Sequence, residues 1–330
     1  TKDKRIIVEF EYSEQSYARF LVYTSNTFKT DKGAFFLNVF SEQDDKNQTL
    51  RQDLSENEKR FLSVIGNDID KAVVPRIDSV GYNPDEVLYR KTDSLAAGTL
   101  YPFVFVHSND PTLAVYRLSF SYLGEGKGNY RLQNSTVNGR VYKWIAPVNG
   151  EKQGNYEPIV LLVTPKKKQV VSFGGTQAFS SMTKASFELA MTNNDPNTFS
   201  SMDANDNLGY AMNVGLEQDI LQADTSRIRL RGRAGYRFVS SNFNPVERFR
   251  NVEFARDWNL LDDSSTGPEN IASVGLEFYE RNTGFVNLNS EFLNRGQQFD
   301  GFRNTLGGNL KFSGFELSMD GSLMNSDDAF

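Results

Sequence analysis

Few side chains in this sequence have the chemistry for covalent catalysis. The chain contains no cysteine and one histidine, His107, which excludes disulfides, thiolate metal sites and a cysteine nucleophile. His107 is followed by Ser108, Asn109 and Asp110, so the residue types of an acyl-transfer triad are present. Adjacent residues at a strand end cannot by themselves place a base, a nucleophile and an orienting group within mutual reach. We therefore predict no catalytic residues and a protein that is not an enzyme.

One segment rich in Asp and Asn has the oxygen ligands that a hard cation prefers. Its candidate calcium ligands are Asp203, Asn205, Asp206 and Asn207. The segment is not an EF-hand loop, because Leu208 stands where that loop needs glycine and Val214 where it needs a bidentate glutamate. Asp195 is near enough in the chain to add a ligand. The alternative is a solvated loop whose side chains cap turns. Calcium is the only cofactor that the sequence suggests.

An arginine-rich segment is the most specific charge pattern in the chain. Strand side chains alternate between two faces, so residues 227–238 would carry apolar side chains on one face and arginines on the other. If this strand belongs to a barrel, the candidates for side chains that face the lumen are Arg227, Arg229, Arg231, Arg233, Arg237, Glu217 and Glu277. Either the arginines pair with Glu217 and Glu277 of neighbouring strands, or they present positive charge to anionic solutes.

A charged and aromatic segment, residues 246–258, lies inside the longest connection that we expect between strands. Its candidates for binding a partner are Arg248, Arg250, Phe254, Arg256 and Trp258. The segment could form a short helix packed into or over a barrel, with Phe254 and Trp258 as anchors. Arg248, Arg250 and Arg256 would then either bind a partner or brace the loop. Long loops of this kind often carry function.

The elements that position these residues are strands of alternating polarity in the second half of the chain. We expect them at residues 169–179, 184–192, 209–219, 227–239, 271–281, 284–294, 305–313 and 314–324. Short and long connections alternate between them, with the long ones at 193–208 and 240–270. Outer-membrane barrels have short turns on one side of the membrane, longer loops on the other, and strands of ~9–11 residues that are apolar outside and polar inside. The pattern predicts an up-and-down transmembrane β-barrel of at least eight strands, incomplete in this chain.

The first half of the chain has a different pattern. Three extended segments precede residue 46, and Thr30-Asp31-Lys32-Gly33 predicts a hairpin turn between two of them. Ser55 and Glu58 have the spacing of a capping box, which predicts one short helix over 55–66. Further short strands predict a sandwich-like β-region. With Lys166-Lys167-Lys168 as the boundary, we predict an all-β protein with a soluble β-rich region at 1–165 and a barrel region at 166–330.

Composition excludes several other classes. No apolar run approaches the ~18 residues of a membrane-spanning helix. The 36 Lys and Arg against 42 Asp and Glu give a net charge of -6, so no partnership with nucleic acid is expected.

Several segments resemble large, uncharacterised outer-membrane β-barrel proteins of Bacteroidota. The likeness is carried by Gly128-Asn129-Tyr130, by residues 138–147 and 153–158, by Thr164-Pro165-Lys166, and by residues 193–201 and 252–258. In such proteins β-sandwich domains precede a barrel. The resemblance implies fold and location only, because the family carries no established activity or catalytic residues.

We therefore expect a fragment of a non-enzymatic outer-membrane protein of a Gram-negative, Bacteroidota-like bacterium. Its role would be transport, assembly scaffold or surface binding, and its partners would be outer-membrane lipid and a protein at the long loops. The alternative is a soluble secreted or surface-anchored protein of several β-domains that binds carbohydrate or protein.

Overall fold

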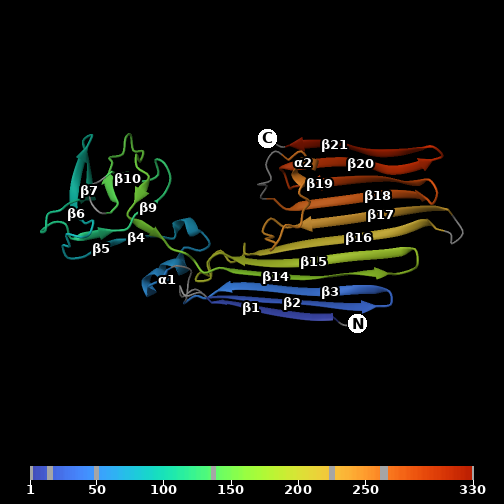
Figure 1. Cartoon of the computed structure of the whole chain (residues 1–330), viewed down its shortest axis with the longest axis horizontal. Coiled ribbons are helices and arrows are strands. Elements are labelled where there is room, and N and C mark those ends of the chain that lie inside the picture. Colours follow the sequence, from blue (N-terminus) through green and yellow to red (C-terminus); the bar gives the residue numbers. More distant parts are fainter. Residues whose placement is uncertain are drawn as a thin grey trace. The chain divides into compact units, whose positions relative to one another are not determined.

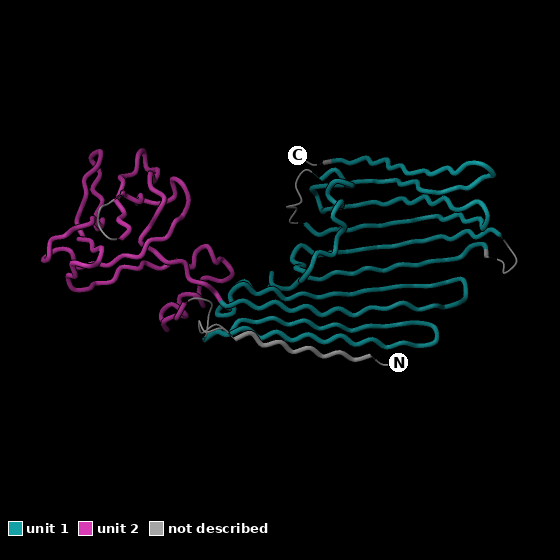
Figure 2. Tube along the Cα trace, in the orientation of Figure 1, with its two compact units in different colours: residues 1–51, 165–330 teal, residues 52–164 magenta. Residues whose placement is uncertain are grey.

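The computed structural model describes residues 3–12, 18–47, 52–134, 139–222, 227–260 and 267–328. The chain divides into two compact units. Unit 1 combines residues 1–51 with 165–330, and unit 2 comprises residues 52–164. Figure 2 shows that both ends of unit 2 continue into unit 1, so unit 2 is an insertion. The protein is all-β, as the sequence predicts.

Unit 1 is an eleven-stranded antiparallel sheet. Its strands are β1 (Asp3–Tyr12), β2 (Ala18–Thr30), β3 (Gly33–Asp44), β14 (Lys167–Ala178), β15 (Thr183–Asp195), β16 (Leu208–Gln222), β17 (Ile228–Val239), β18 (Glu269–Glu280), β19 (Gly284–Asn294), β20 (Phe299–Phe312) and β21 (Phe315–Asp328). Apart from β3 and β14, strands that pair also follow one another in the chain (Figure 1). The sheet is up-and-down but open, with β1 and β21 at its edges, so it is not closed into a barrel.

The connections of the sheet differ between its two ends. At one end, which we call the turn end, short turns such as residues 31–32, 281–283 and 313–314 join the strands. At the other, the loop end, lie residues 196–207 and 240–260 (Figure 1). The predicted connection at 295–304 is shorter than expected, because β20 starts at Phe299 and Phe302 pairs with Phe292.

The predicted boundary at residue 165 agrees with the end of unit 2. The boundary at the start of unit 2, between residues 51 and 52, was not predicted. We expected residues 1–165 to form one region, yet β1, β2 and β3 belong to the large sheet. β3 pairs with β14 from Gln43 opposite Lys167 to Gly33 opposite Gln177. Polar and apolar side chains alternate in β2 and β3 as they do in the later strands. The sequence does not indicate that β3 pairs with β14, because unit 2 separates the two strands in the chain.

Unit 2 is built from short strands around an aromatic core. Its elements are α1 (Glu56–Val64), η1 (Ile69–Lys71), β4 (Val73–Pro75), β5 (Ile77–Ser79), β6 (Tyr89–Ala96), β7 (Thr99–His107), β8 (Tyr116–Leu118), β9 (Ser121–Tyr122), β10 (Tyr130–Gln133), β11 (Val141–Trp144), β12 (Tyr156–Glu157) and β13 (Ile159–Leu161). The sheets β5-β8-β6-β7 and β11-β10-β12-β9 contribute Tyr89, Phe105, Tyr130 and Tyr142 to one buried cluster. Two sheets around one core give the sandwich-like region that was expected.

The predicted capping box begins α1. The Ser55 hydroxyl accepts a hydrogen bond from the Glu58 amide at 3.3 Å, and the Glu58 carboxylate accepts one from the Ser55 amide at 2.8 Å. Two backbone donors of the first turn and the cap are thereby satisfied. The second α-helix, α2 (Phe254–Asp257), is a single turn. In the described part of the chain no helix is long and apolar enough to cross a membrane.

Candidate functional site

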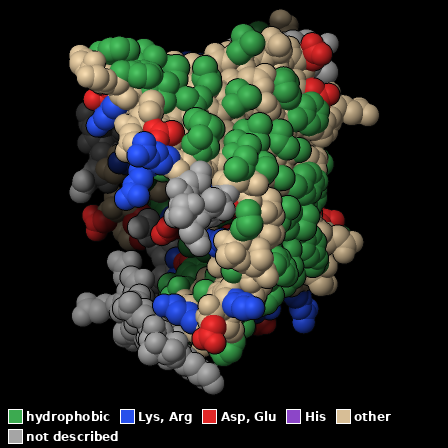
Figure 3. Space-filling view, turned by 90° about the vertical axis from the view of Figure 1, so that its right-hand side faces the viewer, with side chains coloured by type: hydrophobic (Ala, Val, Ile, Leu, Met, Phe, Trp, Pro, Cys, Tyr) green, Lys and Arg blue, Asp and Glu red, His purple; other side chains and the backbone are tan. Residues whose placement is uncertain are grey.

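The large sheet exposes hydrophobic side chains on one face, which we call the apolar face. Opposed residues in the register point to the same side of a sheet, so the register assigns each residue to a face. Large exposed hydrophobic side chains occur on this face in every strand from β2 onward, among them Val22, Leu37, Phe173, Leu189, Leu216, Ile228, Leu276, Leu288, Leu306 and Leu323. Figure 3, seen from the turn end, shows a nearly continuous hydrophobic area running from the top to the bottom of the molecule.

Charged side chains on the apolar face occur only where strands end. For the described strands from β2 onward, they are Lys167, Asp195, Glu280, Asp300 and Asp327. Between these positions the face holds hydrophobic residues, glycines and uncharged polar residues such as Ser290 and Asn304. Val274 is 60% exposed and Leu288 is 47% exposed. A monomeric soluble protein rarely leaves a continuous apolar patch of this extent open to water.

Aromatic residues border the apolar face at both ends. At the loop end they include Phe20, Tyr210, Phe238, Phe292 and Phe302, and at the turn end Phe28, Phe35, Phe278, Phe312 and Phe315. The two aromatic girdles of outer-membrane barrels lie at such positions, and Phe173 and Phe187 are further aromatic residues midway along the face.

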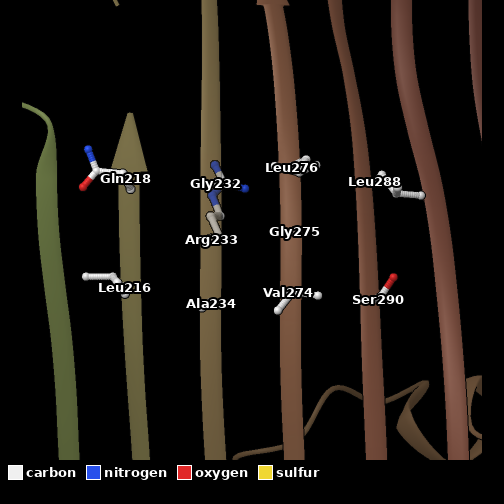
Figure 4. Close-up of a pocket in the computed structure, with 10 residues that line it drawn as sticks. All are labelled: Leu216, Gln218, Gly232, Arg233, Ala234, Val274, Gly275, Leu276, Leu288 and Ser290. Carbon is white, nitrogen blue, oxygen red and sulfur yellow. The ribbon is translucent and has the colours of Figure 1, made fainter. Parts of the chain in front are cut away.

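A depression of about 390 Å³ interrupts the apolar face. Its floor is formed where Gly232 and Ala234 of β17 lack large side chains, and Leu216, Val274 and Leu288 stand around it (Figure 4). Its polar lining residues are Gln218, Arg233 and Ser290 (Figure 4). The other lining residues are apolar or glycine, so the depression offers few hydrogen bonds to a polar ligand.

The opposite side, the polar face, carries the predicted arginines. Arg231 donates to Asp219 at 2.7 and 3.2 Å, Arg233 lies 3.0 Å from Glu277, and Arg229 lies 3.4 Å from Glu277. Glu217 lies 3.8 Å from both Arg231 and Arg233. Most of the arginine face is therefore paired internally, which is one of the two predicted alternatives.

Two predicted arginines differ from this network. Arg227 precedes β17, and its carbonyl accepts a hydrogen bond from the Arg281 amide at 2.9 Å. Arg237 lies on the polar face, but its side chain has no ion-pair or hydrogen-bond partner among the residues that the structure describes. Asp219 was not predicted as a partner of Arg231, although it has the same parity as Glu217 and could have been found from the alternation. Because the sheet is open, none of these residues borders an enclosed lumen.

The long connection between β17 and β18 packs on the polar face. We call its residues 240–260 the strap. Phe254 and Trp258 are 8% and 2% exposed and form a hydrophobic cluster with Ile271, Leu293 and Phe299. Both rings are buried, so they anchor the strap in this cluster, and partner binding by the segment stays a prediction.

The arginines of the strap make contacts within the chain. Arg250 lies 2.8 Å from Glu269, a buried carboxylate that Arg295 also contacts at 3.1 Å. Arg248 donates to the carbonyls of Asn251 and Val252 at 3.3 and 3.1 Å. Arg256, largely exposed, pairs with Glu253 at 2.8 Å. Arg248 and Arg250 therefore brace the strap.

The candidate calcium ligands lie in the loop between β15 and β16. Asp203, Asn205 and Asp206 are exposed, whereas Asn207 is buried and its carbonyl accepts from the Asn194 amide at 2.8 Å. Asp195 accepts from the Asn197 amide at 3.0 Å, at the base of the loop. In the described residues no group of three or more Asp, Glu, His or Cys side chains is arranged to hold a metal ion.

His107 is the last residue of β7 in unit 2. The residues that follow it, Ser108 and Asp110, make hydrogen bonds with each other and with Thr112. Ser108 Oγ accepts from the Asp110 amide at 3.2 Å, and Asp110 accepts from the Thr112 amide and hydroxyl at 2.9 and 2.7 Å. These are turn contacts. Burial lowers the pKa of His107, which favours the neutral imidazole.

In comparisons with known proteins, no family profile and no curated sequence matches this chain.

Proposed function

We propose that the large sheet forms part of the wall of an outer-membrane β-barrel, with its apolar face toward lipid and its polar face toward the interior. The protein would be a non-enzymatic component of a Gram-negative, Bacteroidota-like outer membrane, with a role in transport, assembly or surface binding. One observation carries the proposal, namely an exposed hydrophobic face without charges between the strand ends.

The dimensions of the sheet support this proposal. A barrel strand crosses the hydrocarbon layer with ~9–11 residues at a tilt of ~45°. The strands from β14 to β21 have 11 to 15 residues, and their ends carry the charged residues of the apolar face. Each strand is therefore long enough to cross the hydrocarbon layer and to place its charges among the lipid headgroups.

The edges of the sheet also support a larger assembly. β21 offers 14 residues with one unpaired side, and it contains neither proline nor lysine, although its sequence includes four acidic residues, of the charged kind that protects exposed edges. Closing the sheet would remove both edges. We propose that further strands complete the barrel.

A soluble multi-domain protein that binds carbohydrate or protein is the second candidate. The open sheet and the separate aromatic core of unit 2 favour it. It requires another surface to cover the apolar face. Partitioning separates the two proposals: the barrel is expected in detergent-extracted envelopes, and the soluble protein is expected in the soluble or culture fraction.

Site-directed spin labelling tests the orientation of the sheet. The chain has no cysteine, so a single introduced cysteine is the only residue that a thiol-specific spin label can modify. Nitroxides at Val274 and Leu288, in lipid vesicles, should collide with oxygen, and nitroxides at Ser273 and Asn287 with a water-soluble nickel complex. Equal access of the nickel complex to all four positions would contradict the lipid-facing orientation.

A charge substitution provides an energetic test. Leu288→Arg places a cation near the centre of the apolar face, where a lipid-facing Arg costs ~2–4 kcal/mol. Its neighbour Asn287 faces the other side, so Asn287→Arg is the matched control and should fold nearly normally. The measurement is the free energy of unfolding in vesicles. If both variants lose the same stability, the apolar face is not in lipid.

A further inference from the structure

A groove between the strap and the polar face contains the one arginine of β17 that stands apart from the ion-pair network. Arg229, Arg231 and Arg233 all contact carboxylates at 4.0 Å or less, whereas Arg237 has no such partner in the described part of the chain. A half-buried arginine without a protein partner has its donors available for a carboxylate or another anion. We call the space beside it the strap groove, lined by Glu188, Asn213, Arg237, Phe243, Pro245 and Phe249.

The roof of the groove is fixed to the sheet. The Asn244 amide donates to the hydroxyl of buried Thr192 at 3.1 Å, and Lys168 Nζ donates to Asn244 Oδ1 and to the Pro245 carbonyl, both at 2.8 Å. Gly209 has no side chain at the point where the backbone of Phe243 crosses β16, and a Cβ there would collide with Phe243 Cα. Because this segment is tied to three strands, the groove exists before any ligand binds.

The groove has one apolar side and one charged side. Phe243 and Phe249 form an edge-to-face pair with ring centroids 5.9 Å apart, and with Pro245 they make the wall. Ala190, Ala211 and Val239 give an apolar floor in a cavity of about 220 Å³. The cavity shares Glu188, Ala190, Phe243 and Pro245 with a wider hollow of about 700 Å³ that extends across β14 to Tyr23 and Phe40.

The charged side is a straight row across three strands. Glu188 lies opposite Asn213, and Asn213 lies opposite Arg237. Adjacent strands are ~4.8 Å apart, so the anion and the cation stand on backbones roughly 10 Å from each other. In the described residues no ion pair joins Glu188 to Arg237, and Glu188 has no other ion-pair partner there.

We propose that the strap groove binds short peptides with free termini and apolar side chains. Arg237 would bind the terminal carboxylate, Glu188 the terminal ammonium, and Asn213 the peptide backbone between them. An extended tripeptide spans roughly 10 Å, which is close to the separation of the two strands that carry Glu188 and Arg237. Its apolar side chains would pack on Phe243, Pro245 and Phe249. This proposal does not depend on whether the apolar face of the sheet meets lipid.

Charge and shape together favour a peptide over other small ligands. A neutral sugar would leave both Glu188 and Arg237 without a charged partner. A simple organic anion would satisfy Arg237 and be repelled by Glu188. A zwitterion with its two charges at opposite ends satisfies both residues and buries its apolar part, which is the usual division of roles in a small-molecule site.

The test uses the full chain in detergent and the tripeptide Ala-Leu-Ala with its N-acetyl and C-amide derivatives, measured by calorimetry. Hydrogen bonds to charged groups contribute ~1.5–3 kcal/mol, so removing either terminal charge of the peptide should weaken binding about tenfold or more. Arg237→Gln should weaken binding of the peptide with a free carboxylate about tenfold. It should also abolish the difference in affinity between that peptide and its C-amide derivative. Glu188→Gln should abolish the difference between the free and acetylated amine.

Arg233→Gln is the matched control, because Arg233 lies on the same strand and face but pairs with Glu277. It should leave the affinity unchanged. No binding of Ala-Leu-Ala, equal affinity of the three peptides, or equal loss in Arg233→Gln and Arg237→Gln would overturn the proposal. So would binding of maltotriose that Arg237→Gln does not alter. The peptide derivatives test the wild-type chain, so the result does not rely on the folding of any variant.

Discussion

At the scale of single residues, two tyrosine hydroxyls hold backbone groups in the core of unit 2. Tyr89 Oη accepts from the Tyr142 amide at 2.9 Å, and Tyr130 Oη accepts from the Phe105 amide at 3.1 Å. Each hydroxyl joins one of the two small sheets to the other. Both rings are buried, and burial raises the pKa of each tyrosine to about 12.

These pKa values predict how unit 2 responds to alkali. The neutral phenols are favoured in the fold, so their contribution to stability is complete below the unfolded-state pKa of ~10. It is lost as the pH rises through about 12. An absorbance titration at alkaline pH should show two tyrosines that ionise late, together with the loss of near-ultraviolet circular dichroism. Ionisation of all tyrosines near pH ~10 without unfolding would contradict this.

Substitution separates the hydroxyl from the ring. Tyr89→Phe keeps the packing but leaves the Tyr142 amide buried without its acceptor, at a cost of about 1–3 kcal/mol. Tyr122→Phe is the control, because the Tyr122 side chain is exposed, and its effect should stay within about 0.5 kcal/mol. The measurement is the free energy of unfolding of unit 2.

At the scale of elements, the strap is positioned by a glycine of the strand beneath it. Gly209→Val should displace residues 242–245, since the new side chain would occupy the space of Phe243 and Asn242. Gly321→Val is the matched control, because a Cβ at Gly321 has no atom within 4 Å. Limited proteolysis after Arg248 should accelerate in the first variant only. Equal protection in both would mean that the strap does not rest on β16.

At the scale of the whole molecule, the two units have separate cores. The cluster around Trp258 and Leu293 belongs to unit 1, and the cluster around Tyr89 and Tyr142 to unit 2. Replacing residues 52–164 by a short Gly/Ser linker should therefore leave the sheet intact, because β3 and β14 are direct neighbours. Circular dichroism of the shortened chain should retain its β-sheet signal. Loss of that signal would show that the sheet needs unit 2.

The sequence predicts those features that depend on local alternation. The two faces of β17 follow from parity alone. The hairpin at 31–32 and the capping box of Ser55 depend on residues close together in the chain. Each of these signals lies within a few residues of the structure that it predicts.

Other features carry no local signal. The pairing of β3 with β14 joins residues more than a hundred positions apart. No residue pattern in either strand indicates which strand it pairs with. Whether Phe254 and Trp258 pack inward or remain exposed depends on Ile271 and Leu293, which lie on later strands. The row of Glu188, Asn213 and Arg237 becomes a candidate site only when the strap lies over it.

The insertion of unit 2 has a consequence for the rate at which the sheet assembles. The Lys166 amide donates to Asp44 at 2.9 Å across 122 positions of sequence, and closing so long a flexible loop costs about 2 kcal/mol more entropy than closing a tight one. Gln52 bonds to the Leu161 carbonyl and to the Val163 amide at 2.8 and 2.9 Å, so folded unit 2 brings its own ends together. Early folding of unit 2 thus shortens the flexible loop that is closed when β3 pairs with β14. Delayed folding of unit 2 would slow the pairing of these two strands.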